Sequence, residues 1–258
     1  MLRESLALSE QAVFNDFADN FDIRGKDILE IGGCLPFEYF EKHGVKSWSA
    51  IDPRNRDEKI NEIYTSVNGY AQLILFEDEH FDYLFSCNAF QHIQCFDAAL
   101  NEMLRVLKPG GVLYANFGPI WSSPDGSHIE NVFYKGKAYN FWDDSYIPDW
   151  YHLVYSCREL YEILSSKIDC GLAKALSEFV YLNDWLNRLE FKDYKKIVES
   201  CPSSEIIFFG GAKEFGYQRI IKDYINNYKS KYNNWISQKQ DVLDDYKCRD
   251  LKICLRKK

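Results

Sequence analysis

The stretch that decides the fold is ILEIGGCLPFEYF, residues 28–40. A short apolar run ends at Gly32 and Gly33, and a short helical stretch with Pro36 in its first turn follows, with Gly44 past its end. This order of strand, glycine turn and helix is typical of folds that bind nucleotide-like cofactors. The sequence therefore raises the question of whether a cofactor binds here, and which one.

Strands and helices alternate on both sides of this turn. Residues 5–20 and 96–107 place apolar side chains at helical spacing. Strands are predicted at 27–31, 47–52, 81–86, 111–117, 205–210 and 250–257, with a lysine- and tyrosine-rich helix between the last two. We therefore predict an α/β, Rossmann-like fold with a mostly parallel sheet and helices on both faces.

The chain of 258 residues is expected to form a single domain, 1–258, with an N-terminal helix inside residues 1–25. After Phe117 the pattern breaks into a long stretch rich in Gly, Pro, Trp, Tyr, Asp and Ser, followed by helical segments up to residue 200. Residues 118–200 are therefore predicted to be an insertion, a loop and helical cap that binds the acceptor.

The composition narrows the function classes. The chain is 46% hydrophobic with a formal net charge of −8, which argues against a nucleic-acid binder because such proteins present a basic face to phosphates. No stretch has the roughly 20 apolar residues that span a bilayer, and no signal peptide is apparent. Eight cysteines without C-x-x-C spacing favour free thiols in a reduced, cytoplasmic protein, with no membrane partner.

Polar or small residues follow successive strands, where a parallel sheet of this kind binds its ligand. Asp52 ends the second strand, and a carboxylate there can accept hydrogen bonds from both hydroxyls of a ribose. Tyr70 and Ala71 precede the strand at 81–86. After that strand come Ser86, Cys87, Asn88 and, slightly further on, His92. Their order and spacing together indicate a cofactor crevice.

At these residues the chain resembles class I S-adenosylmethionine-dependent methyltransferases of the small-molecule subfamily. The resemblance rests on ILEIGG, AIDP, FDYLFSCNAFQHI and LNEMLRVLKPGGVLYANF, and it covers residues 27–117 and the last strand. It implies S-adenosylmethionine as the cofactor and a seven-stranded sheet whose last strand, DLKICLRKK, is antiparallel.

The resemblance also implies roles for individual residues. Glu30, Gly32 and Gly33 would surround the methionine end of the cofactor, and Asp52 would hold the ribose. The residues that would border the adenine are Pro53, Arg54, Tyr70 and Ala71. Those that would line the crevice are Ser86, Cys87, Asn88 and His92. Tyr70 departs from the family, which often has an acidic residue there. Glu30 could instead cap a buried turn, because a buried carboxylate needs a partner.

A dinucleotide-dependent dehydrogenase is the rival interpretation. It needs G-x-G-x-x-G, whereas this chain has G-G-C-L-P-F from Gly32 to Phe37. The missing glycines include the one that allows the backbone to approach a pyrophosphate, a group that S-adenosylmethionine lacks. The glycine pattern therefore favours the methyltransferase.

The insertion is expected to contain the residues that bind and activate the acceptor. His128 is the preferred general base with Asp125 as its orienter, and His152 is the second candidate. The aromatic and polar candidates for acceptor contacts are Trp121, Trp150, Tyr151, Asn183 and Arg188. Each has a structural alternative: Pro124–Ser127 is an ordinary turn sequence, and the aromatic residues could simply pack a cap.

The prediction is O-methylation of a small polar acceptor, such as a sugar or nucleotide-sugar hydroxyl. Two alternatives stay open: methylation of a peptide or protein side chain, and a non-catalytic binding protein that kept the fold. No convincing set of metal ligands is present, so no metal is expected. The Asn/Asp-Pro-Pro-aromatic motif used for amide and base nitrogens is replaced by SCNAF, which weakens those acceptors.

Overall fold

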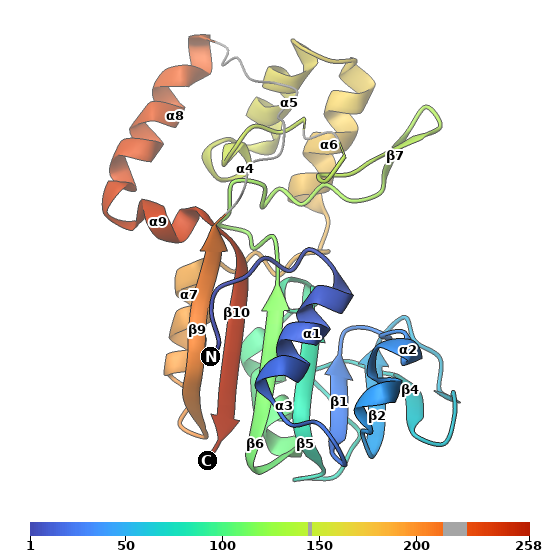
Figure 1. Ribbon diagram of the computed structural model, residues 1–258. Coiled ribbons are helices and arrows are strands. Elements are labelled where there is room, and N and C mark those ends of the chain that lie inside the picture. Colours follow the sequence, from blue (N-terminus) through green and yellow to red (C-terminus); the bar gives the residue numbers. More distant parts are fainter. Residues whose placement is uncertain (144–145, 214–225) are drawn as a thin grey trace. The chain divides into compact units, whose positions relative to one another are not determined.

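The computed structural model describes residues 1–143, 146–213 and 226–258. The chain divides into two compact units, which Figure 1 shows. The first comprises Met1–Gly118, Lys192–Ala212 and Asp250–Lys258, and the second comprises Pro119–Phe191 and Lys213–Arg249. Within the described ranges, no helix is both long and apolar enough to cross a membrane.

The first unit is built on one sheet, whose strand order is β3-β4-β2-β1-β5-β6-β10-β9. The strands are β1 (Asp27–Ile31), β2 (Ser47–Asp52), β3 (Glu58–Lys59), β4 (Tyr64–Asn68), β5 (Phe81–Cys87), β6 (Leu107–Phe117), β9 (Ser204–Lys213) and β10 (Cys248–Lys257). The run from β4 to β6 is parallel, and β10 is antiparallel to β6, which confirms the prediction for the last strand.

The predicted number of seven strands is wrong, because the described part of the chain forms a sheet of eight. The additional strand is β3, only two residues long, which pairs antiparallel with β4 at the edge of the sheet. It is exposed and has no apolar alternation, so it carries no signal that sequence periodicity could detect.

Helices cover both faces of this sheet (Figure 1). α1 (Glu10–Asn20) and α2 (Phe37–Phe40) pack on one face, where Trp48 lies 5.9 Å from Phe14 and stacks at 4.3 Å on Phe40. α3 (Phe96–Val106) and α7 (Phe191–Glu199) pack together, and Tyr194 of α7 lies 5.2 Å from Phe117 at the end of β6. The predicted arrangement of helices on both faces is confirmed.

The first helix is shorter than its periodicity predicts. It begins at Glu10 because the Ser9 side chain accepts a hydrogen bond from the Ala12 amide, a standard N-cap, while Ser9 itself is extended. Residues 5–8 are therefore not helical, although Leu6 and Leu8 fit the helical spacing. At α2, Pro36 precedes the helix instead of occupying its first turn, with φ −54° and ψ 130°.

The second unit is mainly helical, with a small hairpin. Its elements are β7 (Val132–Tyr134), β8 (Lys137–Tyr139), α4 (Tyr151–Val154), α5 (Cys157–Ser165), α6 (Cys170–Leu182), α8 (Asn226–Gln238) and α9 (Leu243–Tyr246). Its core gathers buried residues from Ile129 to Tyr232. The predicted lysine- and tyrosine-rich helix corresponds to α8, and the part of that prediction on residues 214–225 lies outside the described residues.

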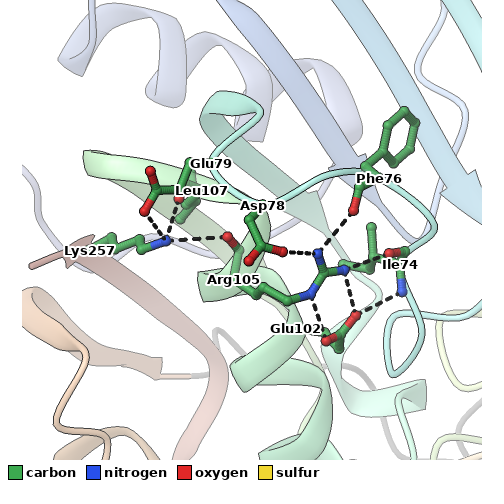
Figure 2. Close-up of polar contacts among 8 residues, drawn as sticks. All are labelled: Ile74, Phe76, Asp78, Glu79, Glu102, Arg105, Leu107 and Lys257. Carbon is green, nitrogen blue, oxygen red and sulfur yellow. Dashed lines mark hydrogen bonds and ion pairs between the residues drawn. The ribbon is translucent and has the colours of Figure 1, made fainter.

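Arg105, near the end of α3, fixes the loop that precedes β5 (Figure 2). Its guanidinium donates to the carbonyl oxygens of Ile74 at 2.7 Å and Phe76 at 3.0 Å, and to the carboxylates of Asp78 at 2.6 Å and Glu102 at 2.9 Å. The planar guanidinium supplies donors in a fixed fork, so one side chain can satisfy several acceptors of the loop at once. The arginine also lowers the pKa of Glu102.

Lys257 of β10 extends this cluster from the other side (Figure 2). Its ammonium donates to the carbonyl oxygen of Leu107 at 2.8 Å and to that of Arg105 at 3.2 Å, and it lies 3.7 Å from the Glu79 carboxylate. The end of α3 and the start of β6 are thereby tied to the last strand.

We expect Arg105→Lys to lower the free energy of unfolding by about 1–3 kcal/mol, because a lysine cannot reach several acceptors and leaves them without a donor. Chemical denaturation measures the change. The matched control is Arg256→Lys, whose guanidinium is half exposed and pairs with Glu205 at 3.5 Å, and it should stay within about 0.5 kcal/mol of wild type. Equal stability of the two variants would contradict this role for Arg105.

Candidate functional site

The glycine turn after β1 is shaped by contacts on both of its glycines. Gly32 has φ +77°, and a Cβ added there would lie 2.2 Å from the Cβ of Ala89. A Cβ added to Gly33 would lie 2.4 Å from the carboxylate of Glu30. Gly32 is therefore required by the conformation and packing of the loop itself, and a side chain at Gly33 would displace the carboxylate of Glu30.

Glu30 is buried beneath this loop and holds it. Its carboxylate accepts the Leu35 amide at 3.0 and 3.1 Å and the Trp48 indole at 2.8 Å. Burial raises the pKa of Glu30 to about 7, against the effect of these two donors, and the carboxylates of Glu10 and Asp52 also raise it. The side chain of Glu30 therefore caps a buried turn, which is the structural alternative that the sequence left open for it.

Asp52 lies at the end of β2, beside the glycine turn. The two strands run in parallel, and the Gly32 amide donates to the carbonyl oxygen of Ile51 at 2.8 Å. Both carboxylate oxygens of Asp52 contact the guanidinium of Arg54, at 2.9 and 3.1 Å, and the Arg54 amide donates at 2.7 Å. Sequence analysis assigned Asp52 and Arg54 to different parts of the cofactor and missed this pair.

Asn55 joins the glycine turn to β2, and sequence analysis did not single it out. Its side-chain amide donates to the carbonyl oxygens of Gly33 and Ala50, both at 3.1 Å. Its place three residues after a strand end, among Asp and Asn residues, is the only signal that could have pointed to it.

The residues predicted to border an adenine lie beyond β4. The side chain of Asn68, at the end of β4, donates to the carbonyl oxygen of Pro53 at 2.8 Å, which joins the ends of β2 and β4. Tyr70 is 62% exposed and pairs with Leu73 in a short bridge, whereas Ala71 is buried. Tyr70 therefore offers an accessible aromatic ring on this side of the turn.

The residues after β5 mostly make contacts within the fold. Ser86 donates to the carbonyl oxygen of Ile31 at 2.8 Å, and burial raises the pKa of the Cys87 thiol, which opposes a nucleophilic role. Asn88 has φ +49°, and its side chain donates to the carbonyl oxygen of Ala7 at 2.9 Å. His92 ends a 3₁₀ turn, with its Nε2 3.2 Å from the side-chain nitrogen of Gln91.

In the second unit, His128 is buried and has φ +48°. Its Nδ1 lies 3.3 Å from the carbonyl oxygen of Pro119, and its Nε2 lies 3.7 Å from the carboxylate of Glu130. The same carboxylate accepts the indole N–H of Trp185 at 3.3 Å. Sequence analysis missed Glu130, although it stands only two residues after His128.

Asp125 was predicted to orient His128, and the structure places its carboxylate in a buried ion pair. Arg249 donates to it at 3.1 Å and the Ser123 hydroxyl donates at 3.2 Å, while the Asp125 carbonyl oxygen accepts the His128 amide at 3.1 Å. The side chains of Asp125 and Arg249 are 0% and 5% exposed. The carboxylate found at the imidazole is that of Glu130.

The other aromatic candidates take part in the core of this unit. His152 has its Nε2 2.7 Å from the carbonyl oxygen of Trp121 and packs against that indole at 4.7 Å. Trp150 donates to the carbonyl oxygen of Tyr246 at 3.0 Å, and Tyr151 is buried in the apolar cluster. These contacts agree with the packing alternative that the sequence left open.

Asn183 and Arg188 lie at the end of α6. Arg188 donates to the carbonyl oxygens of Tyr181 at 3.0 Å and Asn183 at 2.7 Å, and the Asn183 side chain donates to that of Phe179. They therefore satisfy carbonyl groups that a helix leaves open at its end. The Arg188 guanidinium also lies 5.5 Å from the centre of the Trp121 ring.

This site suits an adenosine cofactor without phosphates. Asp52 offers the two carboxylate oxygens that bind a ribose diol. Both oxygens contact the Arg54 guanidinium, so a ribose must displace that side chain. The loop lacks the glycine through which a pyrophosphate is approached, since Cys34 stands there. The antiparallel β10 beside β6 also distinguishes the sheet from the parallel order 3-2-1-4-5-6 of dinucleotide-binding folds.

Comparison with known families gives one match: residues 31–115 match the model of a methyltransferase domain. This range runs from the end of β1 into β6 and includes the glycine turn, Asp52 and the residues after β5. A comparison with curated protein sequences found no match.

Two solved structures are similar to this chain in fold. A Listeria monocytogenes protein proposed to be an S-adenosylmethionine dependent methyltransferase is 13% identical, with a TM-score of 0.54, over 96% of this chain and 100% of that one. The MccD protein is 15% identical, with a TM-score of 0.50, over 99% and 100%. These two likenesses concern the fold. Residues 31–115 therefore match a methyltransferase domain, and this match supports S-adenosylmethionine as the cofactor.

Proposed function

We propose that the protein methylates a hydroxyl group of a small polar acceptor, such as a sugar or a nucleotide-linked sugar. The observation that supports a hydroxyl is the contact between His128 and Glu130 at 3.7 Å. A hydroxyl must lose its proton when it is methylated, and a histidine beside a carboxylate is suited to accept it. Four buried polar residues precede this histidine in the loop: Ser122, Ser123, Asp125 and Ser127.

The bound cofactor supplies an activated methyl group on its sulfonium. The work of the chain is then to hold the cofactor and to orient the acceptor. Glu30 and Asn55 fix the shape of the glycine turn, and Asp52 is proposed to hold the ribose. The adenine is proposed to lie against Tyr70, whose ring is exposed.

His128 is proposed as the general base. With an N–H at Nδ1 directed to the Pro119 carbonyl oxygen, Nε2 carries the lone pair that takes the proton. Glu130 then stabilises the imidazolium that forms. Trp121 and Trp150 are both partly buried, and Trp150 donates its indole N–H to the carbonyl oxygen of Tyr246, so Trp121 is the one proposed as an acceptor contact. Tyr151, Asn183 and Arg188 already serve packing or capping.

Two other functions are distinguished by experiment. Methylation of a peptide or protein side chain predicts activity on peptides and none on sugars. A non-catalytic binding protein predicts cofactor binding without turnover on any acceptor. Incubating the protein with S-adenosylmethionine and panels of sugars, nucleotide-sugars and peptides, and detecting the added methylene by mass spectrometry, separates the three; methylated peptides alone would overturn the proposal.

Asp52→Asn should weaken binding of S-adenosylhomocysteine by about 1–3 kcal/mol, because one acceptor for the ribose hydroxyls is lost. Isothermal titration calorimetry measures the affinity. Asp22→Asn, an exposed residue in the turn before β1, is the control and should bind like wild type. If Asp52→Asn bound S-adenosylhomocysteine as tightly as wild type, the proposed role of Asp52 in binding the ribose would be wrong.

Glu30→Gln should change how stability depends on pH. Because the pKa of Glu30 is raised to about 7 in the folded chain, the folded state binds the proton more tightly than the unfolded state, so stability falls as pH rises from about 5 to about 7. Glutamine does not ionise, so the Glu30→Gln variant does not lose stability for this reason as the pH rises. Across that window the wild type should lose about 2–3 kcal/mol relative to the variant.

Denaturation at several pH values measures this difference. The control is Glu62→Gln, whose side chain is 93% exposed, and its profile should run parallel to that of wild type. If the profile of Glu30→Gln were also parallel, Glu30 would be ionised in the folded chain throughout this range.

His128→Ala should lower turnover about 100-fold while leaving the affinity for S-adenosylhomocysteine unchanged, as expected for a lost general base. Formation of S-adenosylhomocysteine with the acceptor found by the screen gives the rate. His80→Ala, an exposed histidine before β5, is the control and should retain the wild-type rate. Unchanged turnover in His128→Ala would transfer the role to His152 or remove the need for a base.

A further inference from the structure

Gln91, in the 3₁₀ turn Phe90–His92 after β5, is a buried residue with only half of its amide group in use. Its side-chain nitrogen donates to the carbonyl oxygen of Asn88 at 3.0 Å and to that of Gly118 at 3.3 Å. Its side-chain oxygen, Oε1, is buried and has no hydrogen-bond partner among the residues that the structure describes. A buried amide oxygen without a donor costs free energy, so this atom requires a donor.

The direction of the Gln91 amide is fixed by its contacts. Exchanging its oxygen and nitrogen would place Oε1 against two carbonyl oxygens, which have no proton to offer, so the nitrogen faces them. His92 Nε2 lies 3.2 Å from the same nitrogen and accepts from it when it carries no proton. Oε1 therefore points away from both carbonyl groups, and its donor has to come from another direction.

Gln91 lies where β5 and β6 end side by side (Figure 1). Cys87 stands opposite Asn116 in these parallel strands, and the Asn88 amide donates to the carbonyl oxygen of Asn116 at 3.1 Å. The Gly118 amide donates to Asn88 Oδ1 at 3.3 Å, so the Gln91 amide bridges two segments that are already tied together. In an open α/β sheet, ligands bind at the carboxyl ends of the strands, which is where Gln91 stands.

The strand order separates Gln91 from the adenosine side of the site. β1, which carries the glycine turn, is followed in the sheet by β5 and then by β6, while Asp52 ends β2 on the other side of β1. Ala89 is the residue of this segment that packs against Gly32, whereas Gln91 reaches Gly118 on the side of β6. We therefore expect the methyl acceptor, and not the adenosine, beside Gln91.

Asn116 is the other candidate at these strand ends, because its Oδ1 is also buried without a partner in the described ranges. Its side chain shares a face of β6 with Tyr114, since residues two apart in a strand point to the same side, and Tyr114 packs against Phe17 of α1. Its side-chain nitrogen donates to Ser5, ahead of that helix. Asn116 thus holds the segment before α1, and Gln91 is the group that remains for a ligand.

The chemistry of an amide oxygen selects its partner. It accepts hydrogen bonds from O–H and N–H groups and offers nothing to a carboxylate or a phosphate. A sugar carries several hydroxyls beside the one that is methylated, and each of them can donate. The reacting hydroxyl gives its proton to the base, so a neighbouring hydroxyl is the one that can donate to Gln91 throughout the reaction.

We propose that Gln91 Oε1 accepts a hydrogen bond from a hydroxyl of the methyl acceptor next to the one that is methylated. The inference rests on the proposed function, methylation of a hydroxyl on a sugar-like acceptor. Gln91 is then a residue that determines specificity. A site built around a buried oxygen rejects an analogue that lacks the matching hydroxyl, because the oxygen is left unpaired.

The test compares Gln91→Met with Gln91→Glu. Both variants lose the side-chain nitrogen, and only the glutamate keeps an oxygen that can accept. With a sugar or nucleotide-sugar that wild type methylates, at saturating S-adenosylmethionine, Gln91→Met should raise the KM for that acceptor about tenfold and Gln91→Glu by at most about threefold. The control is Gln238→Met, exposed at the end of α8, which should keep the wild-type KM. The affinity for S-adenosylhomocysteine should be the same in all four proteins.

Monodeoxy derivatives of the same acceptor give a readout that a purely structural role would not change. One of them should have a kcat/KM about tenfold lower than the parent sugar with wild type, and the same kcat/KM as the parent with Gln91→Met. Thermal melting checks that the variants are folded. The wild-type comparison needs no variant, so it tests the inference even if Gln91→Met does not fold.

The outcomes separate the inference from the proposed function. If wild type used every monodeoxy derivative as well as the parent sugar, or if Gln91→Met were less stable but kept the wild-type KM and selectivity, Oε1 would bind a water molecule at most. The inference would then be wrong while the proposed function stood. If wild type methylated no sugar or nucleotide-sugar, the proposed function would fail and the inference with it.

Discussion

The first unit depends on one buried carboxylate. Glu30 leaves the middle of a hydrophobic strand and is satisfied by the Leu35 amide and the Trp48 indole, so it links β1, the glycine turn and β2 in one contact. A charge in such a place is costly, which is why its pKa is raised. The turn is therefore shaped before any ligand arrives.

The edge of the sheet around this turn is rich in acceptors. Asp52 brings a negative charge, and Arg54 is the cation that lies against it. A bound ribose competes with that arginine for the same two oxygens. The Arg54 side chain is 71% exposed and the Asp52 side chain is 7% exposed, so a ribose that displaces the arginine replaces one set of donors to a buried carboxylate by another.

Sequence reasoning reached the fold through the elements with strong periodicity, such as α3 and the buried strands. It failed where a short polar contact overrides the pattern: Ser9 caps α1 and removes residues 5–8 from the helix, and β3 pairs without any apolar signal. At the site it found residues at strand ends, including Arg54, but not the partners Trp48, Asn55 and Glu130 or the pairing of Arg54 with Asp52. Such pairings depend on side-chain direction across the fold, which one sequence does not specify.

The contact between Gly32 and Ala89 joins two segments that lie far apart in the chain. Because a Cβ at Gly32 would overlap the methyl group of Ala89, each position limits the size of the other. A larger side chain at either position therefore requires the other segment to move, so the loop after β5 limits the shape that the glycine turn can take.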